Sequence, residues 1–232
     1  SSSVDREHGL TRNTLTLLTA EPDCGATSFG LNFLSCDWNR DANSRMFISL
    51  GDDSTDRILD EHRQFEFIEH LTSHNRTRWH SGLIVQSQIK PAITSEAFVE
   101  SVALALEAAL DSEMPIDKLV IDGLGLLGQR YSQLTRDPDL IEALRVCCIS
   151  RGATPLFIER VPTVPMGARS GTPSQHELYA ENLLRLNRIE LRGRRKFVLS
   201  ALRAYGDHYG EHPFEYIVDE SRENRNISLS SH

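Results

Sequence analysis

Residues 14–36 read TLTLLTAEPDCGATSFGLNFLSC, and this stretch decides the fold that we expect. Its opening TLTLLTA is a short apolar run rich in leucine and threonine, which is typical of a buried strand. Pro22 and Gly25 then indicate a turn. The apolar residues that follow Thr27 suit a helix better than a strand. The stretch therefore predicts a strand, a tight turn and a helix in succession.

Strand, turn and helix in this order are the setting of the phosphate-binding loop GxxxxGK[ST], whose backbone N–H groups hold phosphates at the helix N-terminus. The second glycine of the motif is Gly25 and its Ser/Thr is Thr27, but the first glycine falls on Ala20 and the lysine on Ala26. The candidate phosphate-binding residues are Pro22, Asp23, Cys24, Gly25, Ala26, Thr27 and Ser28. Because Asp23 brings a negative charge and the lysine is absent, we expect any nucleotide to bind weakly.

A second apolar strand, KLVID at residues 118–122, ends in an acid. P-loop enzymes present the aspartate that assists Mg²⁺ binding in this way. If a nucleotide binds, Thr27 and Asp122 are the candidate Mg²⁺ residues. The alternative is that Asp122 only caps a helix or turn, as many strand-ending aspartates do.

The rest of the chain alternates strands and helices and then continues with strands alone. Expected strands are residues 14–20, 45–50, 82–86, 118–121, 154–159, 182–191, 197–202 and 214–218, and expected helices are 27–36, 55–67, 95–112 and 140–150. This order predicts an α/β fold with a mostly parallel sheet, helices on both faces and an antiparallel C-terminal extension. We expect one domain over residues 1–232, with flexible ends at 1–10 and 222–232.

Composition narrows the classes of partner. The formal net charge is −8, which argues against a general nucleic-acid surface. No apolar run reaches the length of a membrane span, so no membrane partner is expected. The four cysteines form no CxxC pair, and no cluster of metal ligands stands out. We therefore expect a cytoplasmic protein with reduced cysteines and no structural metal.

Three further segments resemble the KaiC family of RecA-like ATPases. FISLGDDSTDRI (47–58) is similar to the family's strand that ends in two glutamates, and RGATPLFIER (151–160) to its strand after the Walker B helix. LRAYGDHYGEHPF (202–214) is similar to the family's C-terminal segment with its GE-x-PF motif. The resemblance covers residues 14–220. It implies a RecA-like fold, a site for ATP and Mg²⁺, and assembly of copies into rings.

The catalytic positions of the family are altered in this chain. Its glutamate pair falls on Gly51 and Asp52, which leaves Asp52 as the candidate catalytic residue. Its C-terminal lysine falls on Ala201, whereas its arginine is retained as Arg203, which in the family reaches the nucleotide of a neighbouring subunit. Losing such charges costs orders of magnitude in turnover. We expect a catalytically impaired or inactive ATPase that acts as a regulatory or assembly module.

Two other interpretations stay open. An active ATPase with a rewired site would need a replacement cation, for which Arg12, Lys196 or a neighbour's Arg203 are candidates. A protein-interaction domain would bind no nucleotide, and Thr27 and Asp122 would then be structural. The expected partners are proteins: further copies of this chain in a ring or dimer, or a related ATPase.

Overall fold

The computed structural model describes the chain in segments. The described residues are 10–36, 44–51, 54–72, 77–81, 94–110, 115–126, 137, 139–161, 175–191, 194–204, 214–218 and 227–231. The strands are β1 (Thr16–Ala20), β2 (Ser44–Ser49), β3 (Thr77–Ser81), β4 (Ile116–Asp122), β5 (Thr154–Arg160), β6 (Asn182–Leu191), β7 (Arg194–Arg203), β8 (Phe214–Val218) and β9 (Ile227–Ser231). The helices are α1 (Ala26–Ser35), α2 (Thr55–His62), α3 (Glu66–Thr72), α5 (Ser95–Leu110), α7 (Leu140–Ile149) and the 3₁₀ turn η3 (Gln175–Leu178).

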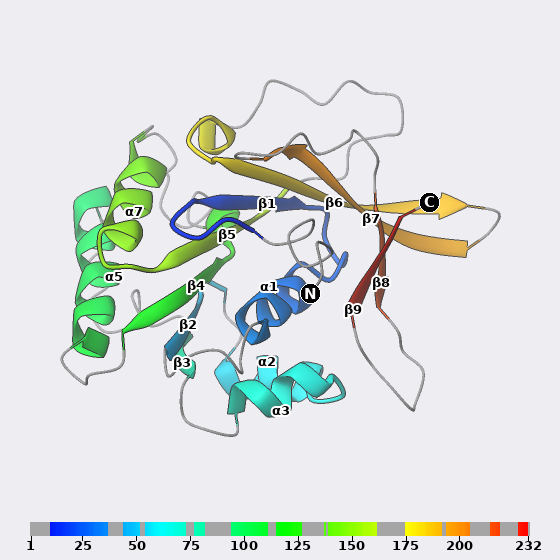
Figure 1. Ribbon diagram of the computed structural model, residues 1–232, viewed down its shortest axis with the longest axis horizontal. Helices are drawn as coiled ribbons and strands as arrows, with labels where there is room; N and C mark the ends of the chain where they lie inside the picture. The colour runs from blue at the N-terminus through cyan, green and yellow to red at the C-terminus, as the bar shows by residue number, and fades with distance from the viewer. Residues whose placement is uncertain are drawn as a thin grey trace, which may run out of the picture.

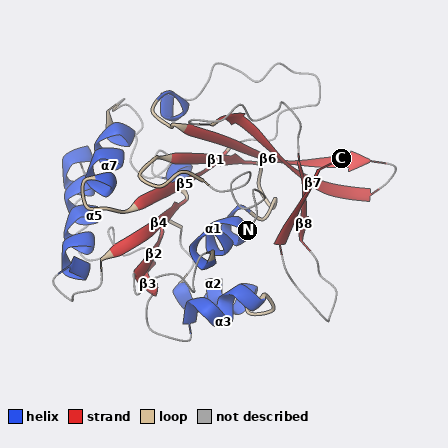
Figure 2. Cartoon of the chain, in the orientation of Figure 1, coloured by secondary structure: helices blue, strands red, loops and turns tan. Residues whose placement is uncertain are grey.

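One sheet runs through the described residues, in the order β3-β2-β4-β5-β1-β6-β7-β8-β9. All pairs from β3 to β6 are parallel, and β7, β8 and β9 continue the sheet as antiparallel neighbours. Helices α5 and α7 lie together on one face of the sheet, and α1, α2 and α3 lie on the other (Figure 1; Figure 2). The RecA-like α/β fold with an antiparallel extension is therefore confirmed.

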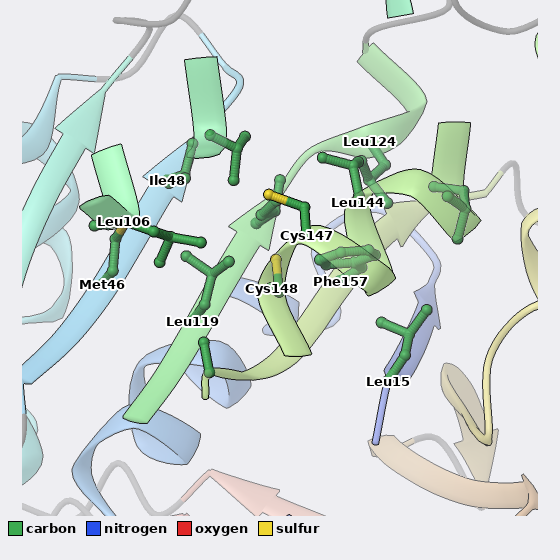
Figure 3. Close-up of a cluster of buried hydrophobic side chains, with 14 of the residues drawn as sticks. Leu15, Met46, Ile48, Leu106, Leu119, Leu124, Leu144, Cys147, Cys148 and Phe157 are labelled. Atoms are coloured by element: carbon green, nitrogen blue, oxygen red, sulfur yellow. The ribbon is translucent and has the colours of Figure 1, made fainter. Parts of the chain in front are cut away.

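Each face of the sheet has its own apolar core, because successive residues of a strand point to opposite faces. In β4, Leu119 and Ile121 belong to the core beneath α5 and α7, whereas Val120 belongs to the core beneath α1, α2 and α3. Figure 3 shows the first of these cores, where Leu106 of α5 and Leu144 of α7 lie over the strands. Burial on both faces explains why the central strands carry consecutive apolar residues rather than a strict alternation of apolar and polar ones.

Helix α1 is held at its C-terminal end by two buried cations. The Arg45 guanidinium donates to the carbonyl oxygen of Leu34 at 3.1 Å. The Lys118 ammonium donates to the carbonyl oxygens of Phe33 at 3.1 Å and Cys36 at 2.8 Å. These positive charges complement the negative end of the helix dipole. The opposite end of α1, with its positive dipole, lies at the edge of the sheet where β1 and β4 end.

Close packing brings α1 down onto the sheet. A Cβ atom added at Gly30 would lie 2.9 Å from Ile158 Cδ1 and 3.1 Å from Val120 Cγ1. A residue with a side chain would therefore require Ile158 and Val120 to shift, or α1 to move away from β4 and β5. Gly30 thus helps to set the distance between the helix N-terminus and the ends of these strands.

Several local expectations differ from the structure. The helix expected over 55–67 is two helices, since Phe65 N–H donates to His62 O at 2.9 Å and the break lets Phe65 enter the core. The structure places β3 at Thr77–Ser81, and the strand expected at 82–86 lies outside the described residues. Residues 227–231 pair with β8 as β9, although 222–232 was expected to be a flexible end. Among the described helices, none is long and apolar enough to cross a bilayer.

Candidate functional site

The turn between β1 and α1 has the backbone of an anion-binding loop. Strand β1 ends at Ala20, Asp23 has φ 60°, and Gly25 has φ 79° with ψ 26°. Gly25 is the N-cap of α1, and no side chain caps the helix there. The N–H groups of the first helical turn have no carbonyl partner within their own helix. They are therefore available to an anion at this end of α1.

A cavity of about 290 Å³ lies in front of this loop, at the small end of ligand pockets, which span roughly 300–1,000 Å³. Its walls come from the loop, the start of α1, helix α2 and the carboxyl ends of β2, β4 and β5. The described lining residues are Glu21, Pro22, Asp23, Cys24, Gly25, Ala26, Thr27, Ser28, Ser49, Gly51, Ile58, Glu61, His62, Asp122, Gly123, Leu126 and Arg160. The seven candidate phosphate-binding residues of the loop are all among them.

Thr27 and Asp122 meet in this cavity. The Thr27 hydroxyl donates to Asp122 Oδ2 at 2.6 Å, and the Asp122 side chain is only 6% exposed. Parallel pairing explains the meeting, because Asp122 lies in register with Ile158 and Ile158 with Leu18, so β4 ends close to where β1 leads into the loop. The proposed role of Thr27 and Asp122 at Mg²⁺ stays a prediction.

Arg160 was not foreseen as a site residue, and it completes a triangle with the same pair. Its Nη2 donates to Thr27 Oγ1 at 3.0 Å and lies 3.4 Å from Asp122 Oδ2. Arg160 is the last residue of β5 and lies in register with Ala20, directly before the loop. In the sequence, Arg160 is an arginine directly after an expected strand. This position points to the site only once β5 is known to lie beside β1.

His62 reaches the loop from α2. Its Nδ1 lies 2.7 Å from the carbonyl oxygen of Ile58, and its Nε2 lies 3.0 Å from the Ser28 hydroxyl. A carbonyl only accepts, so Nδ1 carries a proton, and in the neutral imidazole the Ser28 hydroxyl donates to Nε2. This contact ties α2 to the first turn of α1. The sequence offered no sign of it, because Ser28 and His62 are brought together only by the packing of two helices.

The charge of the lining differs from that of an ordinary phosphate site. Among the described lining residues, Glu21, Asp23, Glu61 and Asp122 are acids, Arg160 is the one arginine, and there is no lysine. Ala26, which occupies the lysine position, is 5% exposed and packs in the core beneath α1.

Cys24 of the loop is buried, and this burial, reinforced by the charge of Glu21, raises the pKa of its thiol to about 11. The thiol therefore stays protonated near neutral pH. The neutral form is a poor nucleophile and a poor metal ligand. Cys24 contributes backbone and packing to the loop rather than reactivity.

Two predicted site residues are not part of this cavity as described. Asp52 lies outside the described residues. Arg203 lies in register with Leu183 of β6. The residue of β6 that lies beside the start of the loop is Leu186, which pairs with Ala20, so Arg203 is three residues away from that level of the strand. Arg203 also donates to the carbonyl oxygen of Glu177. It is therefore not brought to the cavity of its own chain, and its contact with a neighbour's nucleotide stays a prediction.

Comparisons with known proteins bear on the whole chain. The family model described as "ATPase: KaiC" matches residues 4–221. No curated protein matches the chain in sequence. In structure, the chain is similar to a KaiC-like protein from the hyperthermophilic archaeon Pyrococcus horikoshii OT3, with a TM-score of 0.72 and 13% sequence identity over 97% of this chain and 91% of that one. At 13% identity the structural likeness shows the fold alone.

Proposed function

As the chain belongs to the KaiC family of ATPases, we propose that it is a catalytically impaired member that acts as a regulatory or assembly module. One observation carries the proposal: the lysine of the phosphate loop is replaced by Ala26, which is packed in the core and offers no charge to the cavity. An electrostatic clamp on the transferring phosphoryl group supplies much of the rate in such enzymes. Its loss is expected to reduce turnover by orders of magnitude.

The family implies that ATP binds together with Mg²⁺. The phosphate group and the magnesium ion fit this site differently. A phosphate group fits the loop, because the N-terminus of α1 is uncapped and faces a cavity. Magnesium does not fit the arrangement, because the guanidinium of Arg160 contacts both oxygens that would assist it, Thr27 Oγ1 and Asp122 Oδ2. Weak binding of a nucleotide through its phosphates is what this donor set supports.

Phosphate release from ATP by the purified full chain tests the proposal. We expect no steady release above that of a chain carrying both Thr27→Ala and Asp122→Asn. Ala26→Lys, with Ala26→Gln as a neutral control of similar length, shows whether the absent lysine limits the rate. Steady release by the unaltered chain that Thr27→Ala and Asp122→Asn abolish would show an active ATPase and contradict the proposal.

The second candidate is an active ATPase with a rewired site, and the position of Arg160 favours it. Among the described residues, a cation of the same chain reaches the start of α1 from β5, while Arg12, Lys196 and a neighbour's Arg203 stay untested as replacements. In that case Arg160→Ala should abolish phosphate release while the chain stays folded. Retention of release in this variant would exclude Arg160 as the replacement for the lysine.

Assembly is the second half of the proposal and has its own measurement. KaiC-like domains often form oligomers, so we propose that the partners include further copies of this chain, as a ring or dimer, or a related ATPase. Sedimentation velocity with and without ATP measures the state of the chain directly. Arg203→Ala tests the expected contact with a neighbour. A monomer at all concentrations, with no effect of a related ATPase, would contradict the assembly role.

A further inference from the structure

We propose that the guanidinium of Arg160 takes the place of the divalent cation at this site, so that a phosphate-bearing ligand binds at the loop without magnesium. The inference rests on the proposed function in one respect only, namely that the turn before α1 receives phosphate. It concerns which cation balances the negative charge of Asp122 and of the ligand, and it holds whether or not the chain turns over ATP.

The guanidinium of Arg160 lies where a P-loop site holds its metal. In P-loop NTPases the Ser/Thr hydroxyl and the strand-ending aspartate hold Mg²⁺. Here Nη2 of Arg160 lies 3.0 Å from Thr27 Oγ1 and 3.4 Å from Asp122 Oδ2, and the Thr27 proton is donated to Asp122. Magnesium would need to lie about 2.0–2.1 Å from its oxygen ligand. The metal and the guanidinium cannot both occupy this side of Thr27.

The buried carboxylate of Asp122 has the Arg160 cation beside it. Its side chain is 6% exposed, and a carboxylate taken out of water needs a compensating cation or hydrogen-bond donors. Arg160 and Thr27 supply both to one oxygen of the carboxylate, Oδ2, within the chain itself. Because a guanidinium keeps its charge at any ordinary pH, the compensation is permanent. Oδ2 of Asp122 therefore has a cation of its own chain beside it.

The Arg160 guanidinium has more donors than these two contacts use. The contacts with Thr27 and Asp122 both use Nη2, whereas arginine has five N–H donors in a planar fork. The side chain is 43% exposed and lines the cavity. These two contacts do not use the donors on Nε and Nη1, and a phosphate oxygen in the cavity is a partner with which arginine forms strong, paired hydrogen bonds.

The backbone that carries Arg160 is well placed for this role. It lies in the parallel ladder beside Ala20, and Val161 N–H donates to Ala20 O at 2.9 Å. The guanidinium thus starts from a strand hydrogen-bonded to the residue that precedes the loop. A cation built on the sheet can be held near the phosphate without help from a neighbouring subunit.

The test is nucleotide binding to the full chain, measured by isothermal titration with ADP and with ATP, each in excess Mg²⁺ and in EDTA. For the unaltered chain we expect dissociation constants in the two buffers to agree within about twofold. In Arg160→Gln we expect affinity in EDTA to fall by about 10- to 100-fold, as for the loss of one charge-assisted contact. Mg²⁺ should restore part of this affinity, because the variant uncovers Thr27 and Asp122.

Two controls isolate the guanidinium. Arg151→Gln makes the same change just before the opposite end of β5, where Arg151 pairs with Glu107, and should leave binding unaltered in both buffers. Arg160→Lys keeps a charge and should retain binding in EDTA better than Arg160→Gln. The melting temperature of each variant, measured without nucleotide, shows that the chain is folded.

The outcomes separate this inference from the proposed function. Binding to the unaltered chain that requires Mg²⁺ would overturn the inference and leave an impaired ATPase in place. Absence of nucleotide binding in both buffers, for both the unaltered chain and Arg160→Gln, would also overturn it. Steady phosphate release would contradict the proposed function, and it would leave the inference intact if binding in EDTA persisted.

Discussion

The hydroxyl of Thr27 donates to the buried carboxylate of Asp122 at 2.6 Å, across 95 residues of chain. This bond joins the first turn of α1 to the end of β4 at the base of the cavity. The bond stabilises the fold itself, whether or not a ligand is bound, because the carboxylate of Asp122 is nearly enclosed and needs hydrogen-bond donors. Changes to this pair should therefore alter stability in the absence of nucleotide.

Thr27→Val tests that consequence. The substitution keeps the shape of the side chain and removes one donor to a buried carboxylate, so we expect the free energy of unfolding to fall by about 1–3 kcal/mol. Urea denaturation of the full chain measures it. Thr72→Val is the matched control, because the Thr72 hydroxyl donates to carbonyl oxygens of its own helix, at Ile68 and Glu69, rather than to a carboxylate. A Thr27→Val chain as stable as the unaltered one would show that the bond is unimportant to the fold.

Ala26→Lys tests whether the loop still has the shape of a phosphate site. A lysine at this position would add a positive charge to a cavity lined by four acids and one arginine among the described residues. We expect nucleotide affinity to rise by about tenfold or more, as for one charge-assisted contact. Titration with ADP measures the change, and Ala26→Gln controls for the added bulk. Equal affinities in the folded Lys and Gln variants would mean that the loop does not direct this side chain toward phosphate.

Lys118→Met tests the anchor at the other end of α1. Lys118 is 8% exposed, donates to two carbonyl oxygens and lies 5.0 Å from the centre of the Phe33 ring. Removing a charged donor from buried carbonyls should cost about 1–3 kcal/mol of unfolding free energy. Lys196→Met, at a half-buried position of β7, should change it by about 0.5 kcal/mol or less. Equal effects of the two substitutions would contradict the anchoring role.

The pH dependence of stability should include a contribution from Glu142. Hydrogen bonding to Arg145 lowers the pKa of Glu142 below its ordinary value of 4.5. Between the lowered pKa and 4.5 the unfolded chain binds more protons, so stability rises with pH through this window. The stabilisation is fully present above the ordinary pKa and is lost as pH falls through the lowered one. In urea titrations from pH 7 to pH 3, the stability lost in Glu142→Gln should therefore shrink at the acid end. A difference that stayed constant with pH would contradict the assignment.

Alkylation should separate the four cysteines. Cys36 is exposed, whereas Cys24, Cys147 and Cys148 are buried. Burial raises the pKa of all three buried thiols, and the thiolate is the reactive form. With iodoacetamide at pH 8 and detection by mass spectrometry, we expect Cys36 to be modified first and all four to react in urea. Early modification of Cys24 would show that the loop opens.

Local pattern was sufficient for much of the fold. The strand, turn and helix of residues 14–36 follow from an apolar run, Pro22 and Gly25, all of which act within a few residues of chain. Strand β4 is buried along its whole length and carries a run of apolar residues at 119–121, so it could be predicted without knowledge of its neighbours. Where two helices meet at a short break, as α2 and α3 do near Phe65, the pattern reads as one helix.

The candidate site, too, follows partly from local sequence and partly from tertiary structure. By itself the sequence determined the loop, the absence of its lysine at Ala26 and the acid that ends β4, because these are matters of residue type and order along the chain. Only the tertiary structure decided that Arg160 reaches Thr27 and Asp122, since this depends on β5 lying between β4 and β1 in parallel register. Strand order and register are set by burial of both sheet faces over the whole chain, and no local stretch encodes them.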